Sequence, residues 1–209
     1  MLVTTPTIHV EPIDGIALLK KIELAGRTCY RSEGAITDMS YMAFVRNLIN
    51  RGHLSVLEHA CVTVRIICDR GTSHEIVRHR IGSYSQESTR YCNYAGSKLG
   101  KEITFIPYLD GLTNTQIARR GILYKHLEEF YMTELAAGVS PQQARDNLPT
   151  CLRTEIVVTY NLREWLHFLT LRCHTSAHPQ MRKVACMILN ALVNYIPIVF
   201  DTLYADYGL

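Results

Sequence analysis

The sequence has no paired cysteines of the kind that hold small secreted folds or zinc ribbons together. Its cysteines form an odd set without C-x-x-C spacing: Cys29, Cys61, Cys68, Cys92, Cys151, Cys173 and Cys186. Disulfide frameworks and zinc ribbons need paired cysteines at characteristic spacings. We therefore expect reduced thiols, which predicts a cytoplasmic protein.

Long hydrophobic runs are also missing. No apolar stretch approaches the roughly 20 residues that cross a bilayer, and the richest, Val184 to Val193, is interrupted by Asn190. The first fifteen residues include acidic side chains and show no charged-then-apolar signal pattern. With 47% hydrophobic and 20% charged residues, the composition is typical of globular proteins. These features predict one soluble domain over residues 1–209 with no membrane partner.

Several common nucleotide-binding and catalytic motifs are absent. No G-x-G-x-x-G follows a predicted strand, and the sequence contains neither G-x-S-x-G nor H-E-x-x-H. These absences argue against a Rossmann site, a serine-hydrolase elbow and a zincin. We predict no metal site, although the histidine pairs leave a zinc-dependent hydrolase open as an alternative.

Lysine is scarce, whereas arginine is abundant. The 22 basic residues comprise sixteen arginines and six lysines, and the net charge is only +3. Planar guanidinium groups bind phosphates and carboxylates in a bidentate manner, which favours an anionic ligand. Arginine at protein interfaces explains the composition equally well.

Helical and strand patterns alternate along the chain without a regular βαβ rhythm. We predict strands at Thr7–Val10, Cys61–Cys68, Ile103–Pro107 and Thr154–Tyr160. We predict helices at Gly15–Gly26, from a cap at Asp38 or Ser40 through Asn50, at Thr72–Arg80, at Thr113–Ala137, from Ser140-Pro141 onward, at Leu162–Arg172 and at Arg182–Asn194. The expected fold class is α+β, an irregular α/β arrangement with a mixed sheet flanked by helices.

The chemistry is concentrated in residues 74–91, HEIVRHRIGSYSQESTRY. On the predicted helix, Glu75, Arg78 and His79 share one face, whereas Arg78 and Arg80 point in nearly opposite directions toward two anions. The polar loop that follows offers hydroxyls, an amide and backbone N–H groups, which suit a phosphate and the edge of a base. We predict no nucleic-acid partner, although an alternative is that this arginine-rich segment binds nucleic-acid phosphates.

The segment resembles the R-H-R-x7-S signature of the flavin-dependent thymidylate synthases. Here Arg78-His79-Arg80 is followed by IGSYSQE and Ser88. Three further stretches resemble elements of that family: Arg51–His59, Pro141–Pro149 and Asn161–Arg172. Departures from the commonest family form occur at Glu75, Ser85, Gln86 and His167, and over Ala177–Arg182.

The resemblance implies an enzyme that methylates dUMP reductively to dTMP without a cysteine nucleophile. Its cofactor would be FAD, with NADPH and methylenetetrahydrofolate as co-substrates, and its active sites would be shared within a homotetramer. Family analogy assigns the flavin to Ser55, Arg78, His79, Arg80, Gln86, Asn161, Arg163 and His167. It assigns the nucleotide to Glu75, Arg78, Gln86, Glu87, Ser88, Thr89, Arg90, Arg145 and Arg172.

Two residues are candidates for catalysis. In the family analogy, Arg172 stabilises negative charge on the uracil ring, which activates C5. His53 is either a proton shuttle near the flavin or a structural loop histidine. Trp165 and Phe168 are predicted to be core residues. Arg163 and Arg172 lie nine residues apart, which places them on opposite sides of an ideal helix and predicts that they serve different ligands.

Overall fold

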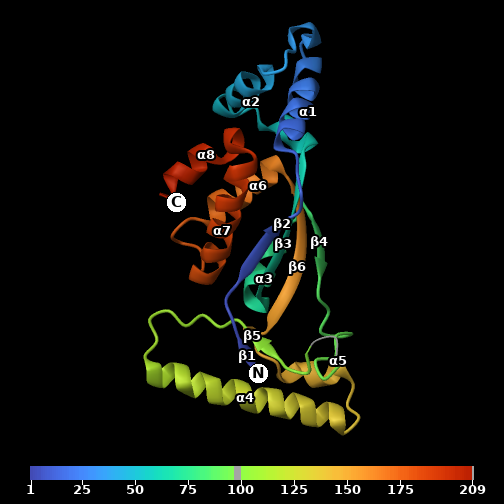
Figure 1. Ribbon diagram of the computed structural model, residues 1–209, viewed down its shortest axis with the longest axis vertical. Coiled ribbons are helices and arrows are strands. Elements are labelled where there is room, and N and C mark those ends of the chain that lie inside the picture. The colour runs from blue at the N-terminus through green and yellow to red at the C-terminus, as the bar shows by residue number, and fades with distance from the viewer. Residues whose placement is uncertain (97–99, 209) are drawn as a thin grey trace. The chain divides into compact units, whose positions relative to one another are not determined.

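A computed structural model describes residues 1–96 and 100–208, and it confirms the α+β class (Figure 1). The strands are β1 (Leu2–Val3), β2 (Thr7–Val10), β3 (Cys61–Asp69), β4 (Ser83–Gln86), β5 (Thr104–Phe105) and β6 (Arg153–Asn161). The helices are α1 (Gly15–Thr28), α2 (Ser40–Asn50), α3 (Arg70–Ile76), α4 (Asn114–Ala136), α5 (Pro141–Ala144), α6 (Leu162–Arg172), α7 (Pro179–Tyr195) and α8 (Pro197–Asp206). Short 3-10 helices are η1 (Glu33–Ala35), η2 (Leu54–His59) and η4 (Arg145–Asn147). No helix in these described ranges is long and apolar enough to cross a membrane.

The chain forms two compact units, and four strands are divided between them. The first unit comprises Met1–Thr7, Ile67–Val77 and Ser85–Ile156, and the second comprises Ile8–Ile66, Arg78–Tyr84 and Val157–Leu209. The larger sheet has the strand order β2-β3-β6-β4, and each of its strands contains a boundary between the units. The single domain over residues 1–209 stays a prediction.

The first unit is built around the long helix α4, with β1, β5 and α5 beside it (Figure 1). Strands β1 and β5 pair in parallel, with Leu2 opposite Thr104. Thr113 caps α4 in a reciprocal capping box with Gln116. The helix ends before Gly138, whose φ of +89° is the left-handed conformation that commonly follows a helix. The apolar core of this unit contains Tyr94, Ile103, Phe105, Tyr124, Tyr131, Ala144 and Leu152.

The second unit packs α1, α2, α6, α7 and α8 against one another. Alternate residues of β3 and β6 are buried, as expected for strands with one face in a core. Trp165, Phe168 and Tyr160 form an aromatic cluster with ring centroids 4.6–5.7 Å apart. The predicted core positions of Trp165 and Phe168 are confirmed, since both are fully buried.

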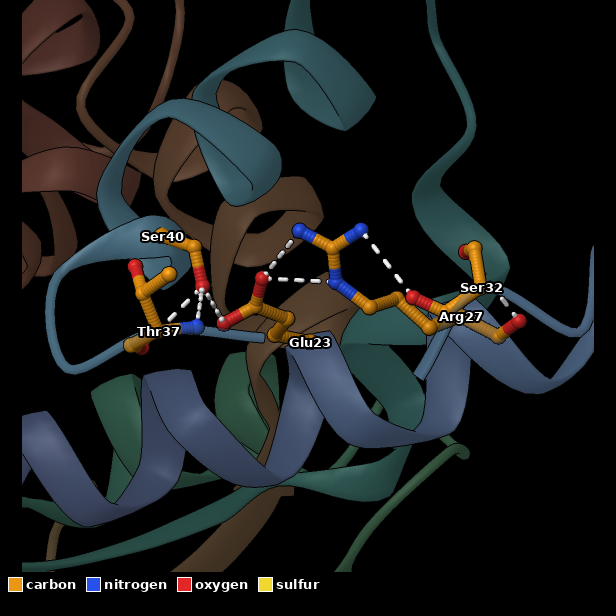
Figure 2. Close-up of polar contacts among 5 residues, drawn as sticks. All are labelled: Glu23, Arg27, Ser32, Thr37 and Ser40. Atoms are coloured by element: carbon orange, nitrogen blue, oxygen red, sulfur yellow. Dashed lines mark hydrogen bonds and ion pairs between the residues drawn. The ribbon is translucent and has the colours of Figure 1, made fainter. Parts of the chain in front are cut away.

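A buried carboxylate ties α1 to the start of α2 (Figure 2). Glu23 is 1% exposed and forms an ion pair of 2.6 Å with Arg27. It also accepts a hydrogen bond from the Ser40 hydroxyl, which in turn accepts one from the Thr37 backbone N–H. The expected cap is therefore wrong: α2 begins after Met39 without a side-chain cap, because the Ser40 hydroxyl is engaged by Glu23 and Thr37.

The predicted helix Thr72–Arg80 is also wrong at both ends. Helix α3 starts at Arg70, because Asp69 caps it through the Thr72 backbone N–H at 2.8 Å, and it stops at Ile76. Residues 83–86, expected to be a loop, form β4 at the edge of the sheet. The chain must leave the helix to reach this strand, and tertiary pairing overrides local propensity.

Candidate functional site

A pocket of about 910 Å³ lies in the second unit. Three segments form its wall: the R-H-R motif with the residue that follows it, the short helix η2, and helix α6 with its cap. The lining residues are Leu54, Glu58, Arg78, His79, Arg80, Ile81, Asn161, Arg163, Glu164, Leu166, His167, Thr170, Leu171 and Arg172. Its volume is in the range of small-molecule and cofactor sites.

The R-H-R segment reaches this pocket from a turn. Gly82 lies against Tyr160, and a Cβ at Gly82 would be 2.2 Å from the Tyr160 ring. This close approach requires glycine and brings the segment against the sheet. Glu75, Arg78 and His79 therefore do not share a helix face, since α3 ends at Ile76. Arg78 and Arg80, expected to point apart toward two anions, line the same pocket.

The pocket carries more positive than negative charge, with four arginines facing two glutamates. The guanidinium groups of Arg78 and Arg80 are exposed and have no hydrogen bond or ion pair within residues 1–96 and 100–208. Arg163, in contrast, pairs with Glu58 at 2.6 Å. Two uncompensated guanidinium groups on one wall make the pocket a site for an anion.

His79 is the buried member of the motif, with 7% of its surface exposed. Its ring packs edge-on against Phe168, with centroids 4.8 Å apart. Its Nδ1 lies 3.3 Å from a carboxylate oxygen of Glu164, and its Nε2 accepts a hydrogen bond of 3.0 Å from Nε of Arg172. Burial, followed by the charges of Arg172 and His167, lowers the pKa of His79 from 6.5 to about 4. The ring is thus neutral at pH 7 despite its carboxylate neighbour.

The side chains of His79, Glu164 and His167 bring three potential metal-ligand atoms within 4.8 Å of one another. Both ring nitrogens of His79 already have partners, however, and the Arg172 cation lies beside one of them. A metal ion would have to displace both contacts and sit next to a guanidinium group. The geometry therefore favours a hydrogen-bonded cluster over a metal centre, and the absence of a metal site stays a prediction.

Most residues that the sequence assigned to the flavin lie together in this pocket. These are Arg78, His79, Arg80, Asn161, Arg163 and His167. Ser55 and His53 are exposed and are not among the described lining residues, although Leu54 between them is. Arg163 and Arg172, predicted to face opposite sides of α6, line the same pocket, so the inference that they serve different ligands loses its geometric basis.

The residues assigned to the nucleotide, apart from Arg78 and Arg172, belong to the first unit, and Gln86, also assigned to the flavin, lies with them. The set is Glu75, Gln86, Glu87, Ser88, Thr89, Arg90 and Arg145. Arg145 donates to the Thr89 hydroxyl at 3.2 Å, and Arg90 donates to Gln142 at 3.1 Å. These contacts hold two guanidinium groups beside the serine- and threonine-bearing loop, as an anion site requires.

Three other members of this loop have internal hydrogen bonds. The carboxylate of Glu87 accepts from Arg153 at 2.6 Å and from Tyr94 at 3.0 Å. Gln86 donates to Ser73 at 2.8 Å, and Ser88 accepts from the backbone N–H of Arg90. The contacts of Glu87 anchor the loop to the first unit.

Glu164 is the functional candidate that sequence reasoning missed. It stands three residues after Asn161, the spacing of a helix-capping box, and Asn161 does accept from the Glu164 backbone N–H at 2.8 Å. The side chain turns instead to His79 and is 6% exposed. Glu58, which lies in the quoted stretch Arg51–His59, was likewise not assigned a role.

Comparison with known proteins supplies independent evidence about the family of this chain. The model of a family described as "Thymidylate synthase complementing protein" matches residues 17–198. A flavin-dependent thymidylate synthase of Geobacter sulfurreducens is 33% identical over 189 residues, covering 86% of this chain and 79% of the relative. One of Mycolicibacterium gilvum is 37% identical over 204 residues, covering 90% of this chain and 80% of the relative.

A solved structure has the same fold. The crystal structure of the UMP/dUMP methylase PolB from Streptomyces cacaoi, bound with 5-Br dUMP, matches with a TM-score of 0.79. The match covers 98% of this chain and 97% of that chain, at 24% sequence identity.

Proposed function

The chain belongs to the family of flavin-dependent thymidylate synthases, and from this membership we propose that it methylates dUMP to dTMP in the cytoplasm as a homotetramer. The carbon donor would be methylenetetrahydrofolate, and the electrons would come from NADPH through FAD. Family membership favours this activity over the nucleic-acid-binding module and the zinc hydrolase. The observation that carries the proposal is the pair of unpartnered guanidinium groups, Arg78 and Arg80, in one pocket with Arg163 and Arg172.

The pocket residues suit a flavin dinucleotide. Unpaired guanidinium forks match the geometry and charge of a pyrophosphate. Apolar side chains of Leu54, Ile81, Leu166 and Leu171 offer surface for a ring system. In the proposal, the groups that hold FAD are Arg78, His79, Arg80, Asn161, Arg163 and His167. When bound, FAD supplies the electrons that reduce the transferred one-carbon unit to a methyl group.

Arg172 is proposed to act on the uracil ring. Its guanidinium group is fixed at the pocket wall by the hydrogen bond to His79. A fixed positive charge stabilises negative charge as it develops on the ring, which makes C5 a better nucleophile. The neutral state of His79 leaves Arg172 as the cation of this pair at pH 7.

The loop of the first unit is proposed to hold the nucleotide. Arg90 and Arg145 would bind the phosphate, and Gln86, Ser88 and Thr89 would contribute amide and hydroxyl groups. Glu87 would support the loop through Arg153 rather than touch the substrate. Glu75 would contact the nucleotide from α3. The role of His53 as a proton shuttle near the flavin is likewise part of the proposal.

Arg172→Ala tests the proposal by separating two half-reactions. We expect NADPH-dependent bleaching of the flavin to continue, because reduction needs no charge on the uracil ring. Formation of dTMP should fall at least about a hundredfold, the scale of losing one electrostatic group at a reacting centre. Stopped-flow absorbance follows the first step and chromatography of the nucleotide follows the second.

The control is Arg65→Ala on β3 of the same unit, which removes an exposed guanidinium group that lies 3.5 Å from the Glu11 carboxylate. It should retain both half-reactions. A wild-type protein that takes up no flavin, or an Arg172→Ala variant with normal dTMP formation, would contradict the proposal.

A further inference from the structure

We propose that Glu164 is a positioning residue, which holds Arg172 in its working orientation through the imidazole ring of His79. The proposal rests on the proposed function, because it assumes that Arg172 acts on the substrate. Three side chains form one chain of contacts: the Glu164 carboxylate, His79 Nδ1 at 3.3 Å, and then His79 Nε2 to Arg172 Nε at 3.0 Å. Glu164 and Arg172 stand near the two ends of α6, so the ring bridges the length of that helix.

The direction of these hydrogen bonds follows from which groups carry protons. A guanidinium group has only donors, so Nε2 of His79 must accept from Arg172. In a neutral imidazole the other nitrogen then carries the proton. His79 Nδ1 therefore donates to Glu164, and the carboxylate selects the tautomer that leaves Nε2 free for Arg172.

Several further contacts hold the His79 ring and its backbone in place. Phe168 packs edge-on at 4.8 Å, and His167 lies at 5.8 Å between ring centroids. The hydroxyl of Tyr84 donates to the backbone carbonyl oxygen of His79. Asn161 fixes the first turn of α6, which carries Glu164. These contacts confine the ring. The position of its proton then decides whether Nε of Arg172 faces an acceptor nitrogen or an N–H group on His79.

The charged and titratable groups around the ring come from four elements and from the motif itself. Helix α6 contributes Glu164, His167, Arg163 and Arg172; η2 contributes Glu58; the motif contributes Arg78 and Arg80; and Tyr84 and Tyr160 approach from β4 and β6. Glu164 is the acceptor aimed at Nδ1 among them. Without a dedicated acceptor there, the Nε2–H tautomer becomes accessible. It would place two N–H groups against each other at 3.0 Å and push Arg172 out of position.

The test is Glu164→Gln in the flavin-loaded protein. Glutamine keeps the size of the side chain, but its amide both donates and accepts and so no longer selects one tautomer. The matched control is Asp201→Asn on α8, which makes the same change in a carboxylate that pairs with Arg46. Both variants are measured for flavin content, for kcat and KM with dUMP, and for the His79 tautomer by NMR with 15N-labelled histidine.

We expect wild type and Asp201→Asn to show the Nδ1–H tautomer, and Glu164→Gln to show a mixture. The kcat of Glu164→Gln for dTMP formation should fall roughly ten- to hundredfold, the scale of losing a charge-assisted hydrogen bond, with flavin content and KM within about twofold of wild type. Wild-type turnover in Glu164→Gln would overturn the proposal. So would a loss confined to KM or flavin content, or a wild-type ring protonated on Nε2. A protein that bound flavin but made no dTMP would contradict the proposed function alone, because the NMR result judges the His79 relay without turnover.

Discussion

At the scale of single residues, His79 shows how surroundings decide a charge. Its ring has a carboxylate within hydrogen-bonding distance, an arrangement that ordinarily favours the protonated form. Burial and the neighbouring cation Arg172 outweigh that effect and lower its pKa to about 4. The histidine of the signature is therefore a neutral hydrogen-bonding group that transmits orientation.

This pKa predicts how stability depends on pH. A histidine with a depressed folded pKa binds its proton more tightly when unfolded, so its contribution is complete above pH 6.5 and is lost as the pH falls toward about 4. One pKa unit corresponds to about 1.4 kcal/mol, so a shift from 6.5 to about 4 corresponds to a loss of at most about 3.5 kcal/mol. The thermal unfolding temperature of the wild type should fall as the pH is lowered from 6.5 to 4. The unfolding temperature of His79→Gln should depend less on pH over the same range. Parallel profiles for the two proteins would contradict the assignment.

Arg78 is predicted to bind both ligands. It is exposed in the pocket and unpaired within residues 1–96 and 100–208, so a ligand is the remaining partner for its charge. Arg78→Ala should lower flavin and dUMP affinity by roughly ten- to hundredfold, the value of one charge-assisted contact. Arg78→Lys should restore little, because an ammonium group cannot reproduce the planar fork. Fluorescence titration of each ligand measures this, and unchanged affinities for both would remove Arg78 from the site.

At the scale of elements, alanine substitutions at two glycines are expected to have opposite effects on stability. Gly82→Ala puts a methyl group 2.2 Å from the Tyr160 ring, so the turn that carries the R-H-R motif must shift. We expect destabilisation of about 1–3 kcal/mol, typical of overpacking, together with weaker flavin binding. Gly121→Ala, inside α4 with nothing within 4 Å of the new methyl, should stabilise by about 0.5–1 kcal/mol. Chemical denaturation of both variants compares them directly, and equal effects would contradict the structure.

The elements predicted well are those whose boundaries depend on local signals. Helix α6 begins and ends at Leu162 and Arg172 as predicted, because Asn161 caps it and its buried stripe is regular. Helix α4 likewise follows its capping residue Thr113. Among the strands and α-helices, three were not predicted: β1, β4 and α8. The two residues of β1 pair with β5 across about a hundred positions, β4 was expected to be a loop, and α8 starts at Pro197 directly after α7.

The candidate site was predictable in its chemistry and less so in its geometry. The motif residues Arg78, His79 and Arg80 do meet Asn161 and Arg163 in one pocket. Their helical placement was wrong, because Gly82 and Tyr160 draw the segment to the sheet, and a contact of that kind has no local signature. The role of Glu164 was hidden for a similar reason: its spacing from Asn161 is that of a cap, whereas its partner lies 85 positions away in the chain.

At the scale of the whole molecule, the family resemblance predicts four copies per assembly. Large apolar side chains are exposed on α4, including Ile122 at 59%, Leu123 at 53% and Phe130 at 48%. Exposed apolar groups along one helix are typical of surfaces that bind other chains. Light scattering coupled to size exclusion should give the mass of a tetramer. A monomer that still reduced its flavin would contradict this prediction.

The sequence contains a single tryptophan, Trp165, and its location has a practical consequence. The indole is fully buried, donates to the Val62 carbonyl oxygen at 3.0 Å, and is joined through Phe168 to the ring of His79 at the pocket wall. Its ultraviolet emission is thus a built-in optical probe of that wall, free of signals from other indoles. Flavins absorb at the wavelengths where tryptophan emits, so flavin binding in the pocket should quench the Trp165 fluorescence by energy transfer. Occupancy can then be followed in real time without labelling the protein.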